Sequence, residues 1–259
     1  MTTGPQVPDW LGVAASVLLV VIAVVAARWA RLGLTRDLLV ASVRAFVQLL
    51  AVGAVLTILF TRAGLLGALA WVAGMILIAG VVAAGRSKEL PKGRPTAWIA
   101  VSVGVATTMG VLLVLGVIEP EPAVVVPVGG MVVSGAMTAT NLTMRRLADI
   151  AHQQRPDIEA RLALGLTADE AMAPHLRGAV TTALLPAIDS TKVVGLIALP
   201  GAMTGLILAG VDPLVAIRYQ IVVMYMLLAA AAVSATVAAR LTRRALFDDA
   251  DRLHRVEPR

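Results

Sequence analysis

Residues 11–27 read LGVAASVLLVVIAVVAA, an uncharged run that Arg28, Arg31 and Arg36 follow directly. A helix rises about 1.5 Å per residue, so a run of this length nearly crosses the ~30 Å hydrocarbon core of a bilayer. Arginines behind such a run are typical of the cytoplasmic flank of a spanning helix. Because no basic segment precedes the run, it predicts an uncleaved first membrane span rather than a signal peptide.

Comparable apolar runs recur along the chain, which has 259 residues, 59% of them hydrophobic. An ordinary soluble domain has about 45–50% apolar residues, so a soluble fold could not bury this much apolar surface. We therefore expect an all-α fold, a polytopic transmembrane helical bundle that forms a single domain over residues 1–259. Seven spans are predicted, at residues 11–27, 38–60, 64–84, 97–118, 123–142, 179–199 and 217–239.

The basic residues predict how the chain is oriented in a cell membrane, either plasma or inner. With the N-terminus outside and the C-terminus in the cytoplasm, 18 of the 22 Lys and Arg residues lie on the inner side. Arg62 and Arg218 lie outside, while Arg44 and Lys192 fall within spans. The net charge of +6 does not indicate a nucleic-acid partner, because only 3% of the residues are aromatic and few could stack on bases.

Several kinds of chemistry are absent from the sequence. The chain has no Cys, which excludes disulfides and thiolate metal ligands. His152 and His175 have no second His at metal-binding spacing, so no metal site is assigned. No G-x-x-x-x-G-K-[ST] stretch occurs, so the chain is not expected to bind ATP in the P-loop manner, and we expect it to carry no cofactor.

The longest polar interruption, residues 143–178, is predicted to be cytoplasmic. Residues 157–164 have helical spacing, Gly165 is placed to end that helix, and Thr167 to Glu170 matches a capping box that begins another. A helix, a glycine break and a second helix are therefore expected there. Residues 200–213 are expected to form a short outer or re-entrant helix, because Pro200 and Gly201 interrupt an apolar stretch too long for one span.

Polar residues inside predicted spans are the candidates for a substrate path. Arg44 and Gln48 lie four residues apart, so they share one helix face, and a charge within a span usually faces the bundle interior or an aqueous path. Asp189 and Lys192 lie three apart and can neutralise each other, either structurally or as a pair that opens during transport. Met131, Met137 and Met203 could contact a soft metal ion, although Met is also a common core filler.

Five segments of the chain stand out together: 42–49 (SVRAFVQL), 158–167 (IEARLALGLT), 185–196 (LPAIDSTKVVGL), 199–213 (LPGAMTGLILAGVDP) and 218–221 (RYQI). In their order and spacing they resemble the FetB family of ABC permeases. That family is associated with bacterial iron export, and it has plant relatives associated with aluminium tolerance and nucleotide-sugar transport.

The resemblance implies a permease subunit, not an enzyme, that forms a homodimer and works with a separate ATPase subunit holding ATP and Mg²⁺. Glu159-Ala160-Arg161, three residues and Gly165 resemble the EAA-x3-G spacing of the cytoplasmic loop that couples such permeases to their ATPase. The residues expected to couple are Glu159, Arg161, Leu164, Gly165 and Thr167.

The chain departs from the FetB pattern at two places. It has Gly135-Ala136 where the family usually has Asn after Gly, and Ala202-Met203 where the family usually has Met-Met. Both changes remove a polar or soft ligand, which leaves the substrate open between a metal ion and a nucleotide sugar. An ion-coupled secondary transporter remains the alternative outside the ABC class, although no internal repeat supports it.

Overall fold

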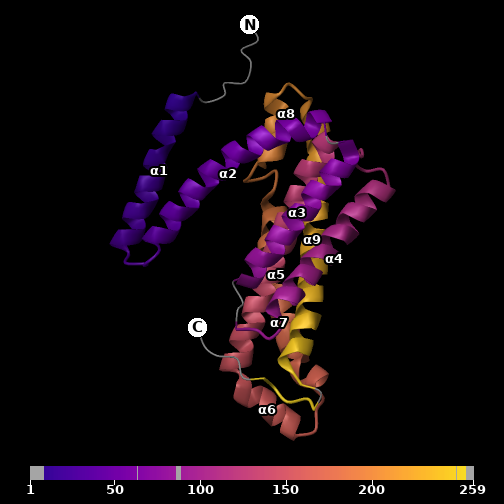
Figure 1. Cartoon of the computed structure of the whole chain (residues 1–259). Helices are drawn as coiled ribbons and strands as arrows, with labels where there is room; N and C mark the ends of the chain where they lie inside the picture. The colour runs from indigo at the N-terminus through magenta and orange to yellow at the C-terminus, as the bar shows by residue number, and fades with distance from the viewer. Residues whose placement is uncertain (1–8, 63, 86–88, 249, 255–259) are drawn as a thin grey trace.

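The computed structural model describes residues 9–62, 64–85, 89–248 and 250–254, and in this part of the chain the regular structure is entirely helical (Figure 1). The expected all-α bundle is confirmed. The helices are α1 (Trp10–Trp29), α2 (Thr35–Arg62), α3 (Gly64–Gly85), α4 (Gly93–Val114), α5 (Pro122–Gln153), α6 (Arg155–Ala163), α7 (Ala168–Val193), α8 (Gly201–Leu208) and α9 (Pro213–Leu246).

Six helices in the described residues are long and apolar enough to cross a membrane: α1, α2, α3, α4, α5 and α9. The chain is therefore a multi-pass membrane protein. The seventh predicted span, 179–199, corresponds to the second half of α7, which is not among these six and carries Asp189 and Lys192.

The predicted end of that seventh span, at residue 199, is wrong. The helix ends at Val193, because Val194 has extended backbone and Gly195 has a φ of +81°. Pro186 lies within α7 and does not end it. The short helix expected after Pro200 is present as α8.

Helices α5 and α9 form the centre of the bundle, with α3, α4 and α7 packed around them. Their buried faces are made mainly of Val and Ala, and the helices approach closely where glycine leaves room. At Gly104 in α4, an added Cβ would lie 1.8 Å from the Ser234 hydroxyl oxygen of α9. Small residues allow such close approach between membrane helices. By contrast, Gly201 and Gly205 of α8 have no atoms within 4 Å of an added Cβ.

Helices α1 and α2 form a hairpin that extends away from the bundle (Figure 1). Helix α1 contacts α2 alone among the described helices, and α2 touches the bundle only at α3 and α5. Helix α6 lies at one end of the molecule and α8 at the opposite end (Figure 1). Which end faces the cytoplasm remains a prediction.

Candidate functional site

The α6 end of the molecule is built from a sharp turn that we call the elbow, residues 155–170. Helix α6 is short and polar, and two ion pairs at i,i+4 spacing stabilise it: Arg155 to Glu159 at 2.7 Å and Arg161 to Asp157 at 3.1 Å. The chain turns just after α6 at Gly165, whose φ is +88°. The amide of Leu166 donates to the carbonyl of Arg161 at 3.2 Å, as in a Schellman motif.

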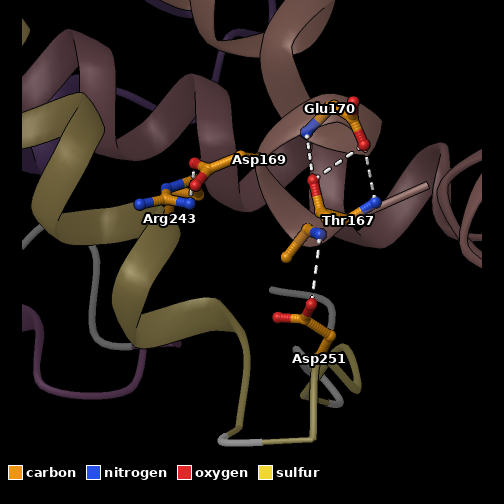
Figure 2. A network of polar contacts seen from close by, with 6 residues as sticks. Thr167, Asp169, Glu170, Arg243 and Asp251 are labelled. Carbon is orange, nitrogen blue, oxygen red and sulfur yellow. Dashed lines mark hydrogen bonds and ion pairs between the residues drawn. The ribbon is translucent and has the colours of Figure 1, made fainter.

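The second half of the elbow begins α7 with the predicted capping box. The Thr167 hydroxyl accepts from the Glu170 amide at 3.3 Å, and the Glu170 carboxylate accepts from the Thr167 amide at 2.9 Å (Figure 2). This amide hydrogen bond, together with one from the Thr167 hydroxyl, lowers the pKa of Glu170. The predicted helix, glycine break and second helix are therefore confirmed as structure.

The tip of the elbow exposes apolar side chains. Leu164 is 82% exposed and Leu166 is 38% exposed, on either side of Gly165. Ile158, within α6, is fully buried. Leu164 is therefore an exposed apolar side chain at the polar end of the molecule rather than along a spanning helix.

A second feature of this end was not predicted. After α9, Phe247 and Leu253 form an isolated antiparallel bridge, and we call residues 247, 248 and 250–254 the C-terminal hook. The Asp248 carboxylate accepts from the amides of Arg252 at 2.8 Å and Ala250 at 2.9 Å. The hydrogen bond from Arg252 is the largest cause of the lowered pKa of Asp248.

The hook is a feature for which the sequence analysis above made no prediction. Two signals could have revealed the hook: an Asp placed to cap a tight turn, and the apolar Phe247 and Leu253 on either side of that turn.

The predicted substrate-path residues do not form one site within a single chain. Arg44 and Gln48 lie exposed on α2, whereas Asp189 and Lys192 lie exposed on α7, and these two helices do not touch. The Lys192 ammonium is 3.6 Å from the Asp189 carboxylate, so the predicted self-pairing is present. Arg44 has no hydrogen bond or ion pair in the described part of the chain.

The methionines lie in separate places. Met137 is partly buried in the bundle core. Met131 lines a groove of about 620 Å³ between α5, α7 and α9. Met203 lines another groove, of about 410 Å³, between α8, α9 and the end of α7.

We call that second groove the α8 groove. One of its lining residues, Gln220, was not predicted as a candidate site residue. Gln220 of α9 lines it and is only 4% exposed, yet neither its amide oxygen nor its amide nitrogen has a hydrogen-bond partner. Met224 and Tyr225, on the same helix, also line the groove. Leaving a buried amide group unpaired costs about 1–3 kcal/mol, so Gln220 is a costly polar group in the wall of the α8 groove. Among the described residues, no three His, Cys, Asp or Glu side chains gather as metal ligands.

Comparisons with known proteins agree with the sequence. Residues 10–247 match the model of a family described as Uncharacterised protein family (UPF0014). The chain belongs to UPF0014. A rice relative, "UPF0014 membrane protein STAR2", is 42% identical over 224 residues, covering 86% of this chain and 79% of its own length.

Two further UPF0014 relatives bear functional names. The "Probable iron export permease protein FetB" of Escherichia coli is 38% identical over 93% of both chains. "Protein ALUMINUM SENSITIVE 3" of Arabidopsis thaliana is 36% identical over 93% of this chain and 88% of its own. The resemblance to the FetB family is therefore confirmed, and the E. coli relative is named a permease rather than an enzyme. No solved structure matches the chain.

The Asp189 and Lys192 pair in this UPF0014 member can be tested by its effect on folding. Either single change, Asp189→Asn or Lys192→Met, leaves one charge on α7 without its partner, which is unfavourable in apolar surroundings. We expect each single variant to lower the yield of folded, membrane-inserted protein and the double variant to restore it. Size-exclusion chromatography in mild detergent measures that yield. A double variant as poor as the singles would contradict self-neutralisation.

Proposed function

We propose that this chain is the membrane-spanning subunit of an ABC transporter. In this proposal two copies form a central path, and a separate ATPase subunit binds and hydrolyses ATP. The elbow is the docking element. The observation that carries the proposal is the elbow itself, a capped helix–glycine–helix turn at the polar end of the bundle with Leu164 exposed at its tip.

The contacts within the elbow support a narrower proposal for the coupling residues. Glu159 forms an ion pair with Arg155, and Arg161 forms one with Asp157. The side chains of Glu159 and Arg161 therefore already have partners within α6. Gly165 and Thr167 shape the turn. Among the proposed coupling residues, this leaves Leu164 as the exposed apolar side chain without an internal role, and we propose that it inserts into a groove on the ATPase.

The proposed cargo is a metal ion, with iron as the first candidate and export as the direction. This proposal is supported by the printed name of the E. coli relative, at 38% identity over 93% of the chain. A nucleotide sugar remains the alternative. The two are separated by measuring uptake of Fe²⁺ and of a nucleotide sugar into proteoliposomes that contain this chain and its ATPase.

Substitution of Leu164 tests the docking. We expect Leu164→Asp to fold normally, because the side chain is 82% exposed, and to weaken ATPase binding at least tenfold by placing a charge in an apolar contact. Gln153→Asp, on the exposed end of α5, is the matched control and should bind normally. The measurement is the amount of P-loop ATPase that co-purifies with the chain from its own membranes in mild detergent.

The same experiment separates the two transporter classes. A secondary transporter has no ATPase partner, so Leu164→Asp would then be silent and collapse of the ion gradient would stop transport. Transport that persists without ATP, with no ATPase bound to the unaltered chain, would overturn the ABC assignment.

A further inference from the structure

We propose that the C-terminal hook and an ion pair between Arg243 and Asp169 together fix the elbow to α9, so that the elbow and α9 move as one body. Motion imposed on the elbow by the ATPase then enters the membrane through α9 as well as along α7, which begins in the elbow. This inference rests on the proposed function, because it assigns a route to the coupling proposed above. It concerns residues of the hook and α9 to which the sequence assigned no role.

Three polar links join the elbow to the hook and to α9. At the start of α6, the two terminal nitrogens of Arg155 donate to the carbonyls of Leu253 and His254, each at 3.1 Å. At the start of α7, the amide of Ala168 donates to the Asp251 carboxylate at 3.5 Å (Figure 2).

The third link does not pass through the hook. Arg243, in the last turns of α9, forms an ion pair with Asp169 in the first turn of α7 (Figure 2). Both halves of the elbow are therefore fixed to the end of the same helix or to the segment that follows it.

An apolar joint lies beneath these links. Ile158 of α6, Met172 of α7 and Leu246 of α9 are fully buried in one cluster. Phe247 and Leu253 of the hook belong to that cluster as well. Close-packed side chains do not slide freely past each other, so the joint transmits displacement rather than absorbing it.

Helix α9 reaches from this joint to the opposite end of the molecule. Its 34 residues correspond to a rise of about 50 Å. Along its length it packs against α4, α5, α7 and α8. Its first turns contribute Gln220, Met224 and Tyr225 to the α8 groove. A displacement of the elbow is thus delivered to the α8 groove by one continuous helix.

The test follows this route and does not depend on knowing the cargo. The chain has no native Cys, so Tyr225→Cys, at a position 67% exposed beside the α8 groove, gives a single labelling site. In nanodiscs that contain the chain and its co-purified ATPase, we expect ATP and Mg²⁺ to change the labelling rate at position 225 at least threefold.

The charge of Arg243 is then reversed in the Tyr225→Cys variant. Arg243→Asp should leave ATPase binding within twofold of normal and reduce the ATP-dependent change in labelling, because one of the links between the elbow and α9 is lost. The double variant Arg243→Asp, Asp169→Arg should restore it. Arg244→Asp, which changes the neighbouring exposed arginine, is the matched control and should respond like the unaltered chain. If Arg243→Asp does not fold, Asp169→Asn replaces it, because that side chain is 71% exposed.

The following outcomes would contradict the proposed coupling of the elbow to α9. A full ATP-dependent change in Arg243→Asp, or loss of ATPase binding in the same variant, would overturn it. A complex that carries Tyr225→Cys alone and hydrolyses ATP without any change in the labelling rate at position 225 would also overturn it. Failure of the proposed function is distinguishable, because the unaltered chain would then bind no ATPase at all.

Discussion

Gly104→Val should leave almost no folded protein. The Cβ of any side chain at this position would lie 1.8 Å from the Ser234 hydroxyl oxygen and 3.1 Å from the backbone carbonyl oxygen of Ala230. The hydroxyl can rotate, but the α9 backbone cannot withdraw without separating α4 from the centre of the bundle. Overpacking of this kind typically costs 1–3 kcal/mol and occasionally more, and a β-branched residue places two further atoms in the same space.

The matched control is Gly110→Val, in the same helix, where an added Cβ meets nothing within 4 Å. The measurement is the monodisperse fraction of each variant after extraction in mild detergent, with Gly104→Ala as an intermediate. We expect Gly110→Val to behave normally, Gly104→Ala to be partly lost and Gly104→Val to be lost. Normal folding of Gly104→Val would show that α4 and α9 do not pack as described.

The membrane spans could be predicted from the sequence because uncharged runs and basic flanks are local features. The predicted span 64–84 differs from α3 by a single residue at one end. Prediction of helix length failed where membrane and water meet. Helix α5 continues to Gln153, eleven residues beyond the predicted end at 142, because a helix does not need to stop at the polar boundary. Hydropathy indicates where the chain leaves the membrane, whereas Gln154 and Pro156 indicate where the helix itself ends.

The elbow could be predicted in outline because Gly165 and the capping box are local signals. The hook could not be predicted from local signals alone. Its links join residues nearly one hundred positions apart in the sequence, such as Arg155 and His254, and only the fold brings them together. The unpaired amide of Gln220 could not be predicted either. The sequence of an apolar helix does not show whether a glutamine within it has a hydrogen-bond partner in the fold.

Arg44→Ala should lower transport at least tenfold while leaving expression and folding near normal. Arg44 lies within the apolar part of α2, exposed and without a partner in the described part of the chain. A charged residue at that depth is costly, about 2.5–3.5 kcal/mol at the centre of a helix, so its retention needs a compensating contact. We propose that this contact is made in the assembled transporter. Normal folding is expected because Arg44 is exposed.

The competing explanation is that Arg44 reaches the membrane surface with its long side chain. Side chains on a helix lean toward its N-terminus, and the N-terminus of α2 lies on the predicted cytoplasmic side. Arg44→Lys separates the two explanations, because lysine reaches the surface equally well but lacks the planar, multiply donating guanidinium. We expect Arg44→Lys to remain impaired and Arg28→Ala, at the end of α1, to transport normally. The measurement is flux of Fe²⁺ in proteoliposomes that contain the ATPase. Full activity in Arg44→Lys would leave Arg44 as an anchor at the membrane surface, with no part in the substrate path.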